Sequence, residues 1–382
     1  MDKKNKNPNV PNLRFNNNPY KKYNLYEFAT RVTRKNKDNV SNLPLTISAQ
    51  YGLVDQVSFF NKTVASKDMS GYYLLKNGEF AYNKSYSNDY PWGAIKRLDL
   101  YNMGCLSTLY ICFKSNDNIV NSNYLVHYFE SPKWHKQVAD IAGEGARNHG
   151  LLNIAVNDFF NTKHAVPTIE NQIKIARFLD LIEERIQTQI KIIDTLSSQK
   201  KQIRNLLFKD IHKNANCCIQ DYVIYEQPQK YIVHSTDYLS YGKDYTPVLT
   251  ANQSFILGYT LEKDGIYEKG DCIIFDDFTN ENKYVDFPFK VKSSALKILQ
   301  TKGGLMLKFF YEYLQFLNFE STDHKRHYLS EVAVTDISVP NLKEQTFVCK
   351  IFTSFDNKIR NEKALLEKYR LQKQFLLNNL FI

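Results

Sequence analysis

The chain has 382 residues, is 43% apolar and carries a formal net charge of +10 at pH 7. This length predicts two or three domains, each with enough apolar residues for a core. Six cysteines without a CxxC pair or a His/Cys cluster argue against a zinc site and favour a reducing, cytoplasmic setting. The longest apolar runs fall short of the ~20 residues that span a bilayer.

The basic charge makes a polyanionic partner plausible and favours nucleic acid, although a basic protein without such a partner stays open. Residues 1–22 are basic but lack the apolar core of a signal peptide, so we expect a flexible N-terminal arm. The Asn and Lys content of this arm is equally well explained by an AT-rich genome.

The first globular domain is expected over residues 23–165. Residues 23–32 predict a short amphipathic helix, and residues 43–113 alternate β-like runs with turns. A helix capped by Ser122 follows, with Pro132 as a break or kink. A basic, glycine-rich loop at residues 143–150 then leads to a first long helix, predicted over residues 166–211.

The second domain, residues 212–338, repeats this order with little sequence identity. Residues 304–318 match the helix after Ser122, and His324–Tyr328 stands in the place of the glycine-rich loop. A second long helix is predicted over residues 339–382. Each domain mixes strands and helices, so the predicted fold class is α+β, with two mixed domains that are each followed by a long helix.

The long helices are the two copies of a repeat. Val166–Phe208 and Val339–Phe381 align position by position, at a constant offset and without a gap. Such a repeat indicates a duplicated unit. The identical positions in the first copy are Val166, Pro167, Gln172, Ile186, Gln199, Lys200, Asn205, Leu207 and Phe208.

Apolar residues follow a heptad in both helices, with polar residues at the same two heptad places. We therefore predict that the helices form an antiparallel coiled coil with pseudo-twofold symmetry. The predicted register sets Lys200 opposite Glu362 and Gln189 opposite Lys373, because a buried lysine without a partner is costly. Pairing of each helix with another protein stays open as an alternative.

A helix of ~39 residues is roughly 58 Å long. Two such antiparallel helices would hold the two globular domains apart at a fixed distance. That arrangement suits two DNA half-sites separated by about one helical turn.

Catalytic motifs are not recognised. Gly265–Gly270 has the spacing of a phosphate-binding loop, but Asp271 replaces its essential lysine. Asn18-Pro19-Tyr20 lacks the second proline of an amino-methyltransferase loop. Asp276 and Asp277 followed by Glu281-Asn282-Lys283 resemble a metal-nuclease triplet, which is common by chance. We expect no catalytic residue, no cofactor and no bound metal.

The two repeat segments share one order of motifs: a proline, a glutamine, a long heptad helix, and then Gln-Lys and Leu-Phe near the end. In this order they resemble the specificity (S) subunit of type I restriction-modification enzymes. Pro340, Glu344 and Gln345 fit the family phrase, whereas Asn171 replaces the glutamate before Gln172 in the first copy. Val10–Phe15 is similar to the family's opening. Lys269-Gly270-Asp271 resembles a recurring turn of its recognition domains, and Asn77-Gly78-Glu79 is a weaker match.

The resemblance implies two target-recognition domains, each reading half of a bipartite, asymmetric site on double-stranded DNA. It also implies helices that dock two DNA methyltransferase subunits, with restriction (motor-nuclease) subunits completing the complex. The specificity subunit itself would be non-catalytic.

Base edges are read by Arg, Lys, Asn and Gln, and phosphates are bound by Lys, Arg and small polar donors. The candidates are the residues of these types in turns of the two globular domains. The alternative for each of them is a solvated surface side chain that does not contact DNA. In the first domain they are Gln50, Lys84, Tyr86, Arg147, Asn148 and His149. In the second domain they are Asn252, Gln253, Lys283, Lys325, Arg326 and His327.

Three other interpretations stay open: a smaller restriction system, a stand-alone nuclease that uses Glu281–Lys283, and a coiled-coil scaffold without a DNA role.

Overall fold

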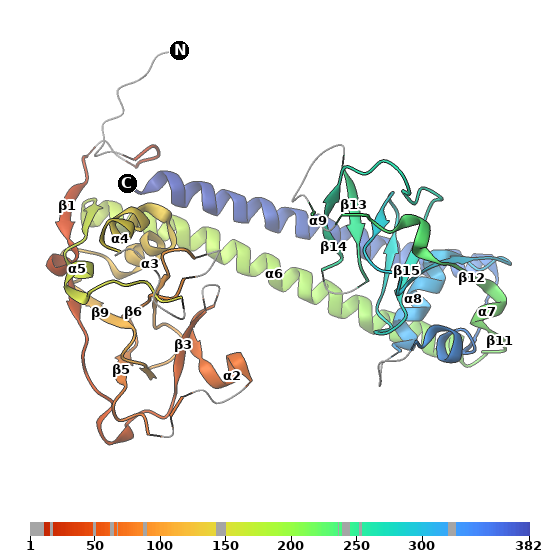
Figure 1. Cartoon of the computed structure of the whole chain (residues 1–382), viewed down its shortest axis with the longest axis horizontal. Helices are drawn as coiled ribbons and strands as arrows, with labels where there is room; N and C mark the ends of the chain where they lie inside the picture. The colour runs from red at the N-terminus through yellow and green to blue at the C-terminus, as the bar shows by residue number, and fades with distance from the viewer. Residues whose placement is uncertain are drawn as a thin grey trace, which may run out of the picture. The chain divides into compact units, whose positions relative to one another are not determined.

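A computed structural model describes the chain over residues 11–15, 18–48, 51–61, 65–66, 68–86, 90–142, 150–235, 237–238, 245–251, 254–319 and 326–382 (Figure 1). Within these ranges, none of the helices has the length and apolar content that crossing a membrane requires. Two helices are much longer than the others: α6 (Ile169–His212) and α9 (Leu342–Leu380). The two predicted long helices are therefore confirmed.

The chain divides into two compact units. Unit 1 is Met1–Gln189 with Leu365–Ile382, and unit 2 is Ile190–Ala364. Each unit therefore contains part of α6 and part of α9. The predicted domain limits at residues 22, 165, 211 and 338 treat the helices as separate segments, and they stay a prediction.

Unit 1 is built on a four-stranded antiparallel sheet and three two-stranded ones. The four-stranded sheet has the order β2 (Ala29–Arg31), β9 (Ile111–Ser115), β6 (Phe80–Asn83), β7 (Ala94–Arg97). The two-stranded pairs are β1 (Lys21–Asn24) with β10 (Lys163–Val166), β3 (Leu45–Ser48) with β4 (Gly52–Asp55), and β5 (Tyr73–Lys76) with β8 (Met103–Leu106). The short helices are α1 (Leu25–Phe28), α2 (Gln56–Phe60), α3 (Ser122–Glu130), α4 (His135–Ile141) and α5 (Val156–Phe160).

Helix α3 shows how local sequence sets the boundaries. Asn121 caps its start, with the side-chain oxygen accepting from the backbone N–H of Tyr124 at 3.1 Å. The helix ends at Glu130, and Pro132 begins a 3-10 turn. Proline cannot continue the helical hydrogen bonds, so the predicted break at Pro132 is confirmed.

Unit 2 has a four-stranded sheet in the order β12 (Val223–Glu226), β18 (Leu296–Thr301), β15 (Cys272–Asp276), β16 (Asn282–Val285). A three-stranded sheet has the order β14 (Ile256–Thr260), β13 (Thr246–Leu249), β17 (Lys290–Val291). The remaining elements are β11 (Cys217–Cys218) paired with β19 (Asp336–Ile337), α7 (Ile219–Tyr222) and α8 (Leu307–Leu317).

The four-stranded sheets of the two units share one topology. A strand, a one-turn helix and an edge strand come first, as β1–α1–β2 in unit 1 and β11–α7–β12 in unit 2. The edge strand pairs with β9 in unit 1 and with β18 in unit 2, so these two strands occupy equivalent places. Only Leu25–Phe28 of the helix predicted over residues 23–32 is helical, because the flanking residues pair in β1 and β2.

A buried glutamine anchors each long helix to the residues that precede a shorter helix, which is α3 in unit 1 and α8 in unit 2. In unit 1, Gln172 accepts from the N–H of Asn121 at 2.6 Å and donates to the carbonyls of Ile119 and Pro167. In unit 2, Gln345 accepts from the N–H of Met306 at 2.7 Å and donates to Gly304 and Pro340. Asn121 and Met306 directly precede α3 and α8, so the two anchors are equivalent.

The heptad prediction is right about burial and wrong about the polar pairs. Apolar a and d residues such as Leu179, Ile186 and Phe352 are buried. Lys200, however, pairs with Asp356 and Glu312 rather than Glu362. Lys373 likewise forms ion pairs with Glu183 and Glu130.

The physical reason is that the heptad scheme considered only the two long helices. Glu130 lies on α3 and Glu312 on α8, so each lysine gains a carboxylate from a third helix. In unit 1, Glu183 contacts Lys373 and Arg185 contacts Tyr369, so rising numbers on α6 meet falling numbers on α9. The helical segments of this unit are therefore antiparallel.

The described part of residues 1–22 is held to the end of α9 within unit 1. The N–H of Leu13 donates to the carbonyl of Asn379 at 2.9 Å, and the Tyr20 hydroxyl donates to the carbonyl of Leu380 at 3.0 Å. These carbonyls lack partners inside the helix because they lie in its last turn. The flexible arm predicted over residues 1–22 stays a prediction, since residues 1–10 and 16–17 lie outside the described residues.

His164 of β10 is a buried histidine held in its neutral form. The Thr162 hydroxyl donates to the carbonyl of Phe159, so the oxygen of Thr162 accepts from His164 Nε2 at 2.8 Å. His164 Nδ1 then accepts from the Tyr128 hydroxyl at 2.8 Å. Burial lowers the pKa of His164 to about 3, because the charged ring would lose its hydration.

Replacing Gln172 with alanine should destabilise unit 1 by about 2–3 kcal/mol, because buried backbone groups would lose their partners. Both tryptophans, Trp92 and Trp134, lie in unit 1, so urea unfolding followed by tryptophan fluorescence measures this unit. The control is Gln374→Ala, an exposed glutamine of α9 in the same unit. Equal stability of the two variants would contradict the anchor.

The free energy of unfolding of unit 1 should decrease as the pH is lowered, because the pKa of His164 is lower in the folded than in the unfolded chain. The unfolded chain binds the extra proton below pH 6.5, so stability present above that pH is lost as the pH falls towards 3. The expected loss from this group between pH 6.5 and 5 is roughly 1.7 kcal/mol. Tryptophan-monitored urea unfolding should show a flatter pH dependence for His164→Gln, and an unchanged slope would contradict the assignment.

Candidate nucleic-acid interface

In unit 1 the connection between β6 and β7 lies beside the loop that leads towards the long helix. The N–H of Tyr86 donates to the carbonyl of Gly150 at 2.6 Å, and the N–H of Leu152 donates to the carbonyl of Lys84 at 2.9 Å. Gly150 is the last residue of the predicted glycine-rich loop. The structure therefore places Lys84 and Tyr86 beside the end of the predicted loop, whose residues 143–149 lie outside the described residues.

Unit 2 repeats this arrangement at the equivalent connection, between β15 and β16. The N–H of His327 donates to the carbonyl of Asp277 at 3.0 Å, and the N–H of Tyr328 donates to the Asp277 carboxylate at 2.9 Å. Residues 324–328 are the segment that the sequence equates with the glycine-rich loop. Each unit thus joins a hairpin connection to the described end of the loop before its long helix. We call these described residues the reading site: 84–86 with 150–152 in unit 1, and 277–278 with 326–328 in unit 2.

The predicted residues differ in how they present their side chains. Tyr86 is 51% exposed, and Arg326 is exposed with its guanidinium 5.7 Å from the centre of the Phe278 ring. Lys283 lies on β16 opposite Ile274 and is partly buried. Tyr86 and Arg326 are therefore the described candidates best placed to meet a ligand.

Two other candidates have structural partners. Lys84 donates its Nζ to the carbonyl of Ile154 at 3.3 Å. His327 is only 2% exposed, with Nδ1 2.9 Å from the Glu331 carboxylate. These contacts favour a role in holding the reading sites in shape. The candidates that lie outside the described residues are Gln50, Arg147, Asn148, His149, Asn252, Gln253 and Lys325.

A polar recess in unit 2, with a volume of about 170 Å³, adjoins this reading site and was not predicted. Asn280 lines it and is 4% exposed, and among the described residues neither of its side-chain amide atoms has a hydrogen-bond partner. Asn282 is already engaged, because its side-chain oxygen accepts from Gln315 Nε2 at 2.6 Å. Gln315 comes from α8, so the sequence around Asn280 could not have indicated this neighbour. The lining residues are Thr279, Asn280, Glu281, Asn282, Lys283, Leu314, Gln315, Asn318 and Phe319.

The acidic residues of the nuclease alternative are used by the fold. Asp276 accepts from the N–H groups of Phe278 and Thr279, which closes the turn after β15. Asp277 is buried and lies 3.0 Å from Lys297 Nζ. A carboxylate already neutralised by a lysine is a poor ligand for a divalent cation, and this argues against a metal-nuclease site at Glu281–Lys283.

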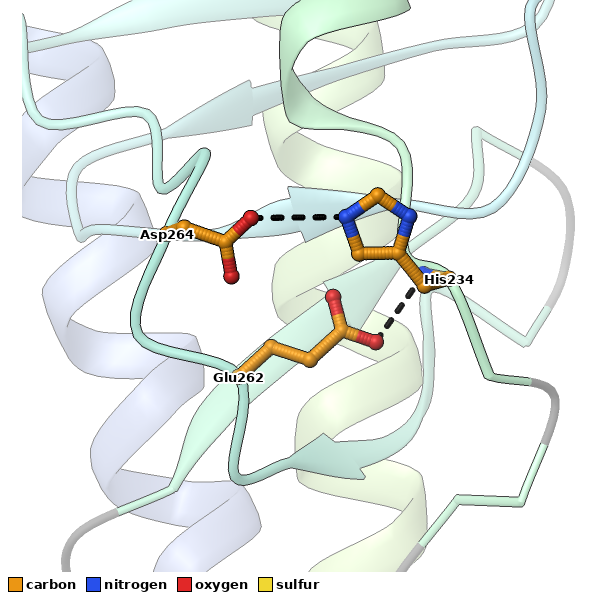
Figure 2. Close-up of side chains that lie close together, drawn as sticks. All are labelled: His234, Glu262 and Asp264. Atoms are coloured by element: carbon orange, nitrogen blue, oxygen red, sulfur yellow. Dashed lines mark hydrogen bonds and ion pairs between the residues drawn. The ribbon is translucent and has the colours of Figure 1, made fainter.

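His234, Glu262 and Asp264 form a group with ligand atoms within 4.8 Å of one another (Figure 2). Lys290 lies 2.6 Å from the Glu262 carboxylate and also donates to the carbonyl of Asp264 at 2.8 Å. Burial would raise the pKa of Glu262, but the hydrogen bond from Lys290 and those from backbone N–H groups lower it below its usual value. The lysine already compensates the charge that would attract a cation, so we interpret the group as an ion-pair cluster at the end of β14.

The comparisons with known proteins concern the sequence and the fold separately. None of the known protein-family profiles matches the chain. One segment is 48% identical over 123 residues to the Type I restriction enzyme EcoR124I/EcoR124II specificity subunit of Escherichia coli. This match covers 30% of the chain and spans 30% of the length of that relative.

Two solved structures are similar over nearly the whole chain. The S subunit of a type I restriction-modification system from M. genitalium has a TM-score of 0.58 at 16% identity, covering 98% of this chain and 99% of that one. A chain from a structural study of complex assembly in the type I R-M system has a TM-score of 0.53 at 14% identity, covering 94% and 96%. The chain thus has the fold of type I restriction-modification S subunits and matches one such specificity subunit in part of its sequence, which confirms the resemblance predicted from the sequence.

Proposed function

We propose that the chain is the non-catalytic DNA-recognition subunit of a type I restriction-modification complex. Each unit reads one half of a bipartite, asymmetric site through its reading site. The observation that carries this proposal is the repeated topology, which places a hairpin connection and a loop together at equivalent positions in both units. The residues at these positions differ between the units, as two unlike half-sites require.

Charge and chemistry support DNA as the ligand. The net charge of +10 favours a polyanion. Arg326 next to the exposed ring of Phe278 in unit 2, and the exposed Tyr86 in unit 1, offer a cation and aromatic surfaces at the reading sites. Arginine is the commonest side chain that reads guanine edges, and it also binds phosphates.

The long helices are the proposed docking sites for two DNA methyltransferase subunits, with restriction subunits completing the complex. In unit 1, Leu181 of α6 and both Leu371 and Phe375 of α9 are exposed. In unit 2, Leu206 of α6 and Phe347 of α9 are exposed. These exposed apolar side chains of the long helices are the residues that we propose to contact the partner subunits.

The test of the proposal is to map methylated bases in cells that express the chain together with its methyltransferase. A split motif with a fixed gap is the expected result. A continuous palindrome is incompatible with two unlike reading sites. Binding without a steep salt dependence would instead favour the scaffold interpretation, because phosphate contacts release counterions.

Arg326→Ala should weaken one half-site only. Losing one base or phosphate contact should reduce affinity by about tenfold, and loss of a phosphate contact should lower the salt slope by about 1. Binding of the complex to DNA with either half-site scrambled measures this directly. Lys358→Ala, which removes the same charge from an exposed position on α9, is the matched control and should not distinguish the half-sites.

Tyr86→Ala should weaken the half-site that Arg326→Ala leaves intact, because the two residues lie in different units. Tyr86→Phe keeps the ring and should retain most of the affinity if stacking dominates, since a base stacked on an aromatic ring contributes about 1–3 kcal/mol. The same scrambled half-site probes provide the measurement. An effect of both substitutions on one half-site would contradict the assignment of one half-site to each unit.

A further inference from the structure

The polar recess of unit 2 has in its wall a side chain that the fold does not use. Asn280 lies in the turn between β15 and β16, with its backbone in the left-handed region at a φ of 59°. Asparagine tolerates this conformation, which accounts for the residue type. The turn is held by other groups, because the N–H of Asn280 donates to the carbonyl of Asp276 at 3.0 Å and the Asp276 carboxylate accepts from two further N–H groups.

The side-chain amide of Asn280 is buried without a partner. Within the described part of the chain, neither its oxygen nor its nitrogen forms a hydrogen bond, although the residue is only 4% exposed. An unpaired donor and acceptor in such a position cost stability, so they require an explanation outside the fold of the turn. This one side chain offers a donor and an acceptor next to each other at the wall of the recess.

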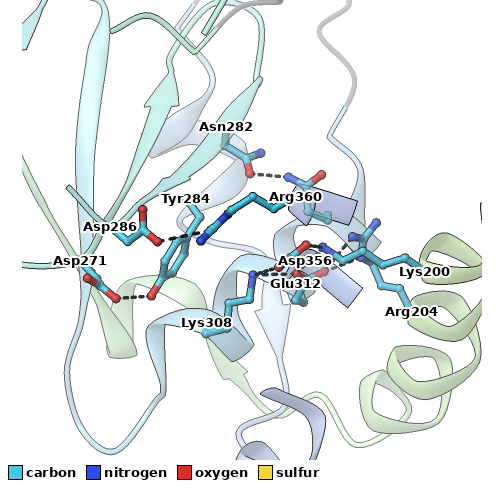
Figure 3. Close-up of polar contacts among 11 residues, drawn as sticks. Lys200, Arg204, Asp271, Asn282, Tyr284, Asp286, Lys308, Glu312, Asp356 and Arg360 are labelled. Carbon is cyan, nitrogen blue, oxygen red and sulfur yellow. Dashed lines mark hydrogen bonds and ion pairs between the residues drawn. The ribbon is translucent and has the colours of Figure 1, made fainter. Parts of the chain in front are cut away.

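Another wall of the recess comes from the end of α8 and is held in place. Leu314 and Gln315 line the recess from this helix. Gln315 Nε2 donates to the side-chain oxygen of Asn282 at 2.6 Å, which ties α8 to the start of β16 (Figure 3). Glu312 of the same helix is fully buried and lies 2.9 Å from Lys200 Nζ of α6. The recess is therefore preformed, as binding sites for small ligands usually are.

The size and charge of the recess restrict what it can hold. Its volume is about 170 Å³. A single water molecule takes up ~30 Å³, and pockets for drug-sized ligands begin at roughly 300 Å³. Glu281 and Lys283 both line the recess, so their formal charges cancel and neither a phosphate nor a metal ion is favoured. The recess therefore suits a small, neutral ring whose edge carries a hydrogen-bond donor and an acceptor.

A nucleobase has these properties, and DNA is the proposed ligand of this unit. Each base carries donors and acceptors along the edge of a flat ring, and asparagine is among the side chains that bind two base atoms at once. The base edges of a duplex lie inside its grooves, so a side chain in the wall of a recess does not reach them. Enzymes that must reach a whole base turn it out of the stack and into a pocket. The same movement would bring a base into this recess.

We propose that the recess captures one base of the half-site read by unit 2 after that base has left the stack, and that Asn280 is the residue that selects it. This inference rests on the proposed function. Phe278, which belongs to the reading site, precedes Asn280 by two positions and is 38% exposed. Phenylalanine is one of the apolar side chains that insert between base steps, so this ring is suited to fill the space that the base leaves.

The test measures how the full chain, together with its methyltransferase, binds DNA that carries the two half-sites found by methylation mapping. Each base pair is converted in turn to a mismatch by changing one strand only. A mismatch removes the pairing that opposes extrusion, so changing the partner of the captured base should raise affinity by about tenfold. We expect such a rise at one position of the half-site read by unit 2. The methyltransferase extrudes its own target base, so a rise at that base is expected independently of Asn280.

Variants of Asn280 identify the captured position. Asn280→Gly removes the amide and suits the left-handed backbone, so the turn should keep its fold. It should abolish the rise at the captured position and reduce discrimination among the four bases there by roughly tenfold. Asn280→Asp keeps the shape but loses the donor, and it should have the same effect if the glycine variant does not fold. Asn361→Asp makes this change at an exposed position of α9 in the same unit and should leave the ratio of mismatched to matched affinity unchanged.

The possible results lead to different conclusions. A rise that occurs only at positions where both Asn280 variants keep it would overturn the inference, because extrusion by the methyltransferase would then explain every rise. The absence of any rise in the half-site read by unit 2 would overturn it as well. If the unmodified chain binds no split site in matched DNA, the proposed function itself fails, and this inference fails with it.

Discussion

The structure depends on one constraint. A helix cannot bury its own apolar stripe, so along their length α6 and α9 must pack against other elements. Within each unit these elements are the other long helix and the helix that follows the four-stranded sheet. The packing interface is not purely apolar, because it contains Lys200 and Lys373. Each of these lysines forms ion pairs that link three helices. Gln172 and Gln345 add a second fixed point at the start of the same short helices.

This arrangement separates what is repeated from what varies. The anchors, the lysine–acid pairs and the strand order recur in both units. The hairpin connections do not: one carries Tyr86, whereas the other carries Phe278 and the recess lined by Asn280. A common frame with different surface loops allows recognition to change without a change in how the units are built.

The sequence predicted the parts of the fold that are periodic or local. The heptads located both long helices, Pro132 located a helix end, and the order of elements revealed the duplication. The sequence did not predict contacts to a third helix, because no spacing along α6 or α9 shows that Glu312 of α8 lies beside Lys200. At the candidate site, residue type alone could not separate the buried His327 from the exposed Arg326, which are neighbours in the chain.

The division of the chain has a consequence for the order in which it folds during synthesis. Unit 2 is one continuous stretch, Ile190–Ala364, and all its contacts are available once that stretch has left the ribosome. Unit 1 needs Leu365–Ile382, because Phe381 packs on Tyr124 and Tyr128, and Leu380 accepts the Tyr20 hydroxyl. The unit that is translated first is therefore completed last, and its incomplete apolar surface stays exposed until the second unit has been made.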